Sequence, residues 1–156
     1  MSIWRPLTSG ILVGGVVLVV IAVAVSFIVA NFQPKTLLQI GSGTFQATVA
    51  SDDAARKKGL SGIESMKPDD ALIMVFQTDD LHGIWMKDMK IPIDIIWLDA
   101  DKRVVDVKRE APPELSDTKT YVPSKDARYV IELQTGSIQR NGIKAGDQAT
   151  FTIGEK

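Results

Sequence analysis

The sequence predicts a mainly β domain preceded by one membrane-spanning helix. Residues 10–30 contain no charged side chain. The rest of the chain has several short segments in which apolar and polar residues alternate, and Gly, Pro and Asp residues separate them. We count about eight strands and one or two short helices, and we expect a compact β-sandwich or a partly open β-barrel with a minor α+β component.

Residues 10–30 are long enough and apolar enough to cross a bilayer. The 21 residues include 14 Ile, Leu, Val or Phe, and as a helix they would measure roughly 31 Å, against a hydrocarbon core of about 30 Å. Arg5 and the terminal amine lie before the segment, and Lys35 lies after it. Since basic residues favour the cytoplasmic side, we expect residues 1–9 in the cytoplasm and the C-terminal domain, residues 37–153, outside it.

The same segment has a second interpretation as a cleavable export signal. The triplet Ala24-Val25-Ser26 resembles a small-x-small cleavage site, although it lies inside the apolar run. We favour an uncleaved signal anchor, with the lipid bilayer as its partner and residues 31–36 as a short linker. Cleavage would release a secreted domain, so both interpretations place the domain in the periplasm or outside the cell.

Composition excludes several classes of function. The chain has no cysteine, so disulfides, thiol nucleophiles and thiolate metal sites are excluded. Its 18 basic and 19 acidic residues give a net charge of −1. No run of five or more basic residues occurs, which argues against nucleic acid as a partner. None of these features fixes the oligomeric state.

The first part of the domain is expected to be a hairpin followed by a short helix. Strands at Thr36–Ile40 and Thr44–Val49 flank a Gly-Ser-Gly turn, whose length suits antiparallel strands. Ser51 or Asp52 can cap the following helix, and Gly59 supplies a left-handed exit. Acidic residues in the first turn and basic residues in the last turn complement the helix dipole.

The centre of the domain is expected to be a sheet. Ala71–Phe76 is a continuous apolar strand. Ile91–Leu98 is apolar on both faces, which is typical of a central strand that is buried on both sides. Arg103–Lys108 alternates between apolar and polar residues, so it should form a hairpin with the preceding strand.

A long connection and two further strands complete the domain. Residues 110–127 show no apolar periodicity and contain three prolines, so we expect an irregular connection of a kind that is often functional. Strands at Tyr129–Leu133 and Gln148–Ile153 follow, with one helical turn at Gly136–Asn141 between them.

Five segments of the domain occur in an order that is typical of one known family. They are residues 56–62 (RKKGLSG), 71–76 (ALIMVF), 85–97 (WMKDMKIPIDIIW), 127–136 (ARYVIELQTG) and 142–147 (GIKAGD). Through them the chain resembles the domain-of-unknown-function 192 family, whose members are small, often exported proteins of bacteria and archaea. The resemblance covers residues 37–153. It implies a compact, predominantly β fold and no established activity.

Two positions depart from the pattern of that family. Asp70-Ala71 stands where a Gly-Met pair is common, and Asp88 stands where Asn is frequent after Trp-Met-Lys. If the Asn makes a specific contact in the family, Asp88 changes the charge of that contact.

Four residues are candidates for lining a ligand site: Arg56, Trp85, Lys87 and Asp94. Arg56 can form a bidentate pair with a carboxylate such as Asp94 or Glu132, or with an anionic ligand. Trp85 suits either the core or a pocket floor, and Lys87 suits either solvent or an anion at the pocket rim. Asp94 lies among apolar residues, where a carboxylate must be paired, hydrogen-bonded to the backbone or shifted in pKa. It either caps a turn or serves as a functional acid.

Metal and triad chemistry have weaker support. His82 is the only histidine and lies near Asp79 and Asp80, but no repeated metal-ligand spacing accompanies it. Nothing that resembles a nucleophile elbow accompanies any serine. We therefore predict neither a metal nor a cofactor.

The predicted function is that of a membrane-anchored binding or accessory module of the cell envelope. Its partner would be a small anionic ligand or an envelope component, and residues 110–127 would cover the site. Two alternatives stay open. One is an envelope enzyme that uses the carboxylate of Asp94 and the amine of Lys87. The other is a structural assembly partner.

Overall fold

The computed structural model describes Val17, Val19 and residues 35–113 and 119–154. Within these ranges no helix is long and apolar enough to cross a membrane. The predicted span at residues 10–30 lies outside them, except for Val17 and Val19.

The described part of the chain contains eight strands and two short helices, so the predicted mainly β class is confirmed. Their bounds are β1 (Lys35–Ile40), β2 (Gly43–Ala50), α2 (Asp53–Lys58), β3 (Asp70–Asp80), β4 (Ile84–Trp85), β5 (Ile93–Leu98), β6 (Val104–Ala111), β7 (Thr120–Tyr121), β8 (Ala127–Gln134) and α3 (Ser137–Arg140). All of them belong to one compact unit, Pro34–Lys156, which we call the β domain.

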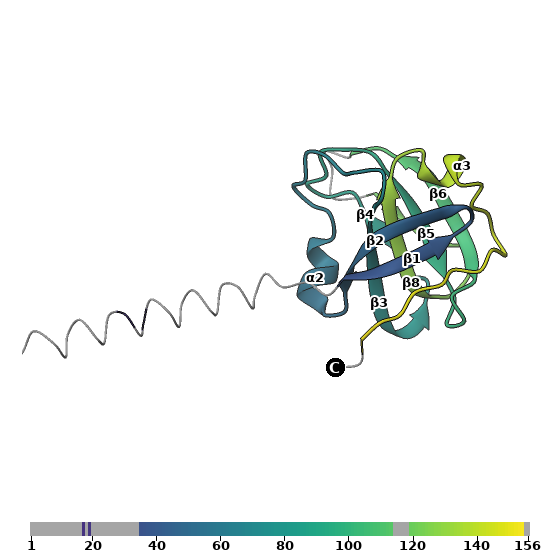
Figure 1. The fold of residues 1–156 in the computed structure, drawn as a ribbon, viewed down its shortest axis with the longest axis horizontal. Coiled ribbons are helices and arrows are strands. Elements are labelled where there is room, and N and C mark those ends of the chain that lie inside the picture. The colour runs from purple at the N-terminus through teal and green to yellow at the C-terminus, as the bar shows by residue number, and fades with distance from the viewer. Residues whose placement is uncertain (1–16, 18, 20–34, 114–118, 155–156) are drawn as a thin grey trace, which may run out of the picture. The chain divides into compact units, whose positions relative to one another are not determined.

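The strands form two open sheets. The larger sheet has the order β1-β2-β3-β8-β5-β6, and β4 pairs with β7 in the smaller one (Figure 1). Neighbours in the larger sheet are antiparallel, except that β2 and β3 run parallel. Parallel neighbours need a crossover, and α2 lies in the connection between these two strands. The two predicted hairpins, β1 with β2 and β5 with β6, are confirmed.

Apolar layers cover both faces of the larger sheet. β5 lies between β8 and β6, and all six of its residues are buried. Ile96 and Leu98 pack into one apolar cluster, whereas Ile93, Ile95 and Trp97 pack into a second cluster. Successive side chains of a strand point to opposite faces, so the two clusters lie on opposite faces of the sheet. Burial on both faces, which the sequence predicted, explains why every residue of this strand except Asp94 is apolar.

The start and end of α2 also follow the sequence. Asp52 is the N-cap, and its Oδ1 accepts a hydrogen bond from the Ala55 N–H at 2.8 Å. Gly59 follows the helix with φ at 49°, a conformation in which a side chain is strained. A Cβ at Gly59 would lie 3.1 Å from Met74 Cε and 3.6 Å from Glu132 Oε2. The exit of the helix therefore lies close to β3 and β8.

The prediction of a strand at Gln148–Ile153 was wrong. Gln148 forms an isolated bridge to Arg103, and Thr150 forms another to Gln39 of β1. Because neighbouring residues of this segment pair with different partners, no continuous ladder develops. The segment, drawn in yellow, instead runs beside β1 as an irregular segment, joined to β1 by the Thr150 bridge (Figure 1).

Residues 110–127 are less irregular than predicted. β6 continues to Ala111, and Thr120–Tyr121 forms β7, which pairs with β4. A strand of two residues is too short to show an apolar period, which is why the sequence pattern missed it. Residues 114–118 lie outside the described ranges.

Candidate functional site

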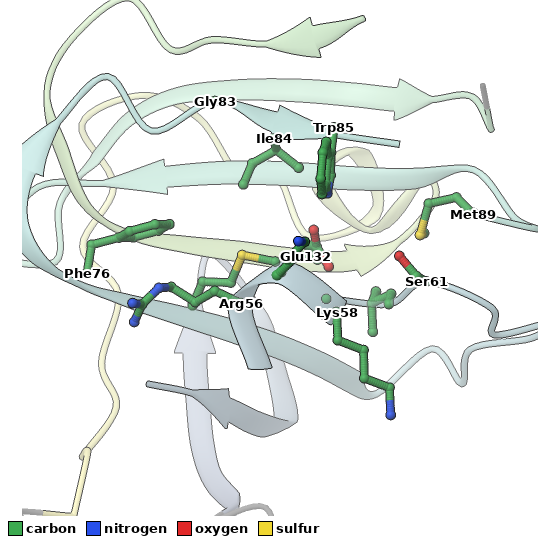
Figure 2. Close-up of a pocket in the computed structure, with 13 residues that line it drawn as sticks. Arg56, Lys58, Ser61, Phe76, Gly83, Ile84, Trp85, Met89 and Glu132 are labelled. Carbon is green, nitrogen blue, oxygen red and sulfur yellow. The ribbon is translucent and has the colours of Figure 1, made fainter. Parts of the chain in front are cut away.

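A cavity of about 250 Å³ lies where the exit of α2 meets β3, β4 and β8. Its walls are mostly apolar and come from Leu60, Met74, Phe76, Ile84, Trp85 and Met89. Three basic residues, Arg56, Lys57 and Lys58, also line it. Figure 2 shows the carboxyl group of Glu132 between Trp85 and the end of α2, so we call this space the Glu132 cavity.

Glu132 is the chemically unusual group in this cavity. It lies in β8, paired with Leu72 of β3 and Ile95 of β5, and its side chain is 3% exposed. Its Oε2 has no hydrogen-bond partner in the described structure. Burial raises the pKa of Glu132 to about 8, because water no longer stabilises the charged form. At neutral pH the group is therefore mainly an uncharged carboxylic acid, which can donate a hydrogen bond.

Arg56 lines the cavity but does not neutralise Glu132. Its Nη1 donates hydrogen bonds to the carbonyl oxygens of Ser51 at 2.8 Å and Val75 at 2.7 Å, and its Nη2 forms an ion pair with Asp53. The guanidinium also lies over the ring of Phe76, 5.2 Å from the ring centroid. Arg56 thus joins α2 to β3, and neither of the two predicted carboxylate partners, Asp94 and Glu132, is bonded to it.

Trp85 and Lys87 lie close together beside the cavity. Trp85 is 38% exposed, so it is a wall residue and not a core residue. A more open hollow next to the Glu132 cavity is lined by Trp85, Lys87 and Asp88, among others. The Lys87 Nζ lies 5.8 Å from the centroid of the Trp85 ring. The structure therefore gathers three of the four predicted site residues, Arg56, Trp85 and Lys87, in one region.

Asp94 lies elsewhere. It is fully buried in β5, on the same face as Ile96 and Leu98 and on the opposite face from Glu132. Its Oδ1 accepts the Glu110 N–H and its Oδ2 accepts the Ile138 N–H, both at 2.8 Å. Asp94 lines neither of the two hollows. Of the two predicted interpretations, the hydrogen bonds favour the cap that holds the start of α3.

The sequence pattern also indicated Glu132 as a candidate, although it was not among the four predicted site residues. Glu132 follows Val130 and Ile131 and precedes Leu133 in a strand of apolar residues, just as Asp94 interrupts the apolar strand β5. Any carboxylate buried among apolar residues needs a partner or a shift in pKa, so Glu132 was as strong a candidate as Asp94. The sequence suggested Glu132 only as a possible partner of Arg56, because its position facing a cavity depends on the fold.

Asp88 has a backbone role that explains its departure from the family pattern. Its φ is 55°, in the left-handed region that Asn and Asp adopt more readily than other residues with a side chain. Its carbonyl oxygen accepts the Gly62 N–H at 2.9 Å, and next to it the Ser61 hydroxyl donates to the Lys87 carbonyl at 2.9 Å. The frequent Asn therefore suits the same turn, and Asp88 preserves that turn.

His82 is occupied by packing contacts. Its ring stacks on Phe76 with the centroids 3.6 Å apart, and its Nε2 lies 2.9 Å from the Thr78 carbonyl oxygen. In the described ranges no group of three or more His, Asp and Glu residues is placed to hold a metal ion.

Comparison with known proteins connects this domain to one family. The family model DUF192, described as "Uncharacterized ACR", matches residues 36–151. A UPF0127 protein of Thermococcus kodakarensis is 32% identical over 101 residues, which cover 65% of this chain and 61% of that protein. A UPF0127 protein of Pyrococcus horikoshii is 32% identical over 110 residues, which cover 67% of this chain and 88% of that protein.

Two solved structures share the fold. A Sinorhizobium meliloti protein proposed to be a transcription regulator has a TM-score of 0.70 and 23% identity, covering 76% of this chain and 95% of its own. A Novosphingobium aromaticivorans protein of unknown function has a TM-score of 0.68 and 26% identity, covering 76% and 84%. The chain spans 61% of the length of the first archaeal relative. Since the family model matches residues 36–151, the chain belongs to the DUF192 (UPF0127) family, an uncharacterised family of unknown function.

Proposed function

We propose that this protein is a binding module of the cell envelope, anchored by residues 10–30, and that its Glu132 cavity takes a small organic anion with an apolar body. The observation that supports the proposal most strongly is the cavity itself, an apolar space with basic residues around it and a carboxyl group inside, whose Oε2 has no partner among the described residues. Concave, mostly apolar spaces with few polar groups are the usual form of small-molecule sites.

The size of the cavity limits the ligand. At about 250 Å³ it is slightly smaller than the typical range for drug-sized ligands and suits a molecule of about ten non-hydrogen atoms. Such a ligand would bury about 200 Å² of apolar surface, which favours binding by about 5 kcal/mol before the loss of rigid-body freedom. Since a Kd of 1 mM corresponds to about 4 kcal/mol, we expect affinities in the millimolar range.

The charge of the ligand follows from the residues around the cavity. Lys57 and Lys58 are exposed at the end of α2, and Lys87 lies beside Trp85 in the adjoining hollow. These positive charges favour a carboxylate, sulfonate or phosphate at the mouth of the cavity and disfavour a cationic ligand. Since Lys57 and Lys58 are exposed, their attraction for the ligand will weaken with salt.

The two alternative functions have less support. An enzyme built on Asp94 and Lys87 needs both groups in one cleft, and Asp94 lines neither hollow. An assembly partner needs an exposed apolar patch without a pocket, whereas the exposed Trp85 borders a pocket.

The methionines provide a direct test of ligand binding. Of the five in the chain, Met74 and Met89 line the cavity, and Met66 and Met86 do not. The full chain, methyl-labelled at methionine and held in lipid nanodiscs, would be titrated with hexanoate while methyl NMR spectra are recorded. The Met74 and Met89 signals should move and saturate while those of Met66 and Met86 stay in place. Without a saturable shift at Met74 or Met89, the proposed binding function is wrong.

The location at the envelope has its own test. Protease added to spheroplasts, from which any outer membrane has been removed, should digest the β domain, and the intact mass of the membrane-extracted protein should include residues 10–30. Protection of the β domain from external protease would contradict the proposed orientation, and a mass lacking those residues would contradict the anchor.

A further inference from the structure

We infer that Glu132 is the specificity-determining residue of the cavity and donates a hydrogen bond to an uncharged oxygen at the buried end of the ligand. The ligand class is then an apolar organic acid with its anionic group at the mouth and a carbonyl or hydroxyl oxygen at the opposite end. This inference rests on the proposed binding function and adds to it the chemistry that the cavity selects.

Glu132 is buried beside the cavity. Its side chain is 3% exposed and its Oε2 has no partner, although buried oxygens are nearly always hydrogen-bonded. The space beside it is the cavity, since Glu132 is one of the lining residues. A ligand that fills the cavity with a hydrogen-bonding end would supply the contact that the β domain does not.

The neighbours of Glu132 determine its protonation. β3 presents Leu72 and Met74 beside it, β5 presents Ile95, and β4 presents Ile84 and Trp85, all without a titratable group.

Charged and titratable groups near the cavity come from α2 and from two positions nearby. In α2, Arg56 bonds to two carbonyl oxygens and to Asp53, and Lys57 and Lys58 are exposed. Outside α2, Lys87 lines the adjoining hollow and His82 stacks on Phe76. In the described structure none of them is bonded to Glu132. Its pKa is accordingly raised to about 8 by burial, and at neutral pH it carries a proton that it can donate.

A buried acid can in principle select either of two ligand ends. The protonated form donates to an oxygen acceptor without any change in charge. The ionised form would instead attract an ammonium group. A cationic end must pass the basic residues around the cavity and force Glu132 to release its proton, so the acceptor is favoured. Affinity for a ligand with an acceptor end should fall as pH rises, and affinity for a ligand with a cationic end should increase.

The experiment compares three acids that differ only at the end remote from the carboxylate. They are hexanoate, the methyl-ketone acid of the same chain length, and ω-aminohexanoate, each titrated into the methionine-labelled full chain in nanodiscs. We expect the ketone acid to bind about five- to tenfold more tightly than hexanoate, because only its inner oxygen can accept the hydrogen bond. Its affinity should fall about tenfold between pH 7 and pH 9 as Glu132 ionises with a pKa of about 8.

Two variants provide matched controls. Glu132→Gln keeps an N–H donor of similar shape and does not titrate, so the preference for the ketone acid should persist and its pH dependence should disappear. Glu132→Met removes the donor and keeps an apolar side chain of similar length, so the ketone acid and hexanoate should bind equally. The unshifted Met66 and Met86 signals report that each variant remains folded.

Each other outcome contradicts a specific step. Tighter binding of ω-aminohexanoate that increases with pH and is lost in Glu132→Gln would overturn the acceptor in favour of a cation. Equal binding of all three acids, with Met74 and Met89 shifted, would overturn the role of Glu132 and leave the proposed function standing. Absence of binding by every acid would remove both.

Discussion

The two faces of the larger sheet each bury one acid, and the two acids differ in their partners. Asp94 on one face accepts two backbone N–H groups at 2.8 Å. Glu132 on the other face lies beside a cavity, with an oxygen that has no partner among the described residues. Both residues interrupt apolar strands, so their sequence contexts are nearly the same. A buried acid therefore indicates a ligand site when the fold leaves it without a structural partner.

The physical difference lies in what solvates each carboxyl group. Two N–H donors replace water around Asp94, and they also hold Glu110, whose φ is 50°, and the start of α3. No group among the described residues replaces water at Glu132 Oε2, so the uncharged form is favoured and the pKa rises to about 8. Asp94 therefore stabilises the fold, whereas Glu132 reduces its stability at neutral pH and is available to a ligand.

The same acid-to-amide substitution on each face should separate these roles most strongly. In Asp94→Asn the amide nitrogen must face one of the two N–H donors, so a buried donor loses its acceptor. We expect a loss of about 3 kcal/mol in the free energy of unfolding. Urea unfolding of the full chain in nanodiscs, monitored by tryptophan fluorescence, measures it. Glu132→Gln should unfold at a urea concentration close to or above that of the wild type at neutral pH. Equal losses in both variants would break the comparison.

The pH dependence of stability should show the second difference. Between the ordinary pKa of 4.5 and the raised value of about 8, the native state holds a proton on Glu132 that the unfolded chain has released. The free energy of unfolding should therefore fall as pH rises through this window, by about 1.4 kcal/mol per pH unit from this group. Urea unfolding of wild type and Glu132→Gln from pH 5 to pH 8 isolates the contribution. Parallel curves for the two proteins would show that Glu132 ionises normally.

The basic residues near the cavity should act on ligand affinity and not on the fold. We expect the double change Lys57→Glu and Lys58→Glu to weaken hexanoate binding by about five- to tenfold at low salt, because both residues are exposed at its mouth. Titration of the Met74 methyl signal gives the affinity. Lys144→Glu is the control, since Lys144 is exposed and lines neither hollow. A similar loss in the control would mean that net charge alone is responsible.

The turn at Asp88 should give the smallest effect. Asp88→Asn keeps a residue that tolerates a positive φ, so stability should change by less than about 0.5 kcal/mol. Asp88→Ala should lose about 1 kcal/mol, because the left-handed conformation is strained for alanine. Thermal unfolding of both variants tests this. If Asp88→Asn instead changed hexanoate affinity strongly, the negative charge of Asp88 would belong to the site on the Glu132 face.

Local signals in the sequence determined most of the elements. The cap at Asp52, the exit at Gly59, the hairpins and the doubly buried β5 all follow from neighbouring residues, because caps, turns and apolar periods are short-range properties. The structure places Arg56, Trp85 and Lys87 in one region and Asp94 outside it. The sequence pattern failed to predict pairing between strands that come from distant parts of the chain. β7 needs β4 as its partner, and the segment at Gln148–Ile153 divides its pairing between Arg103 and Gln39.

The apolar segment at residues 10–30, the mainly β domain of the DUF192 family and the acids within apolar strands are all evident from the amino-acid sequence. Which of the two acids has partners depends on the tertiary structure. Whether a carboxylate meets two N–H groups or an open cavity depends on elements that come together in space, here Glu110 and α3 for Asp94, and α2 and β4 for Glu132. Solvation is a property of those surroundings, and no local pattern encodes it.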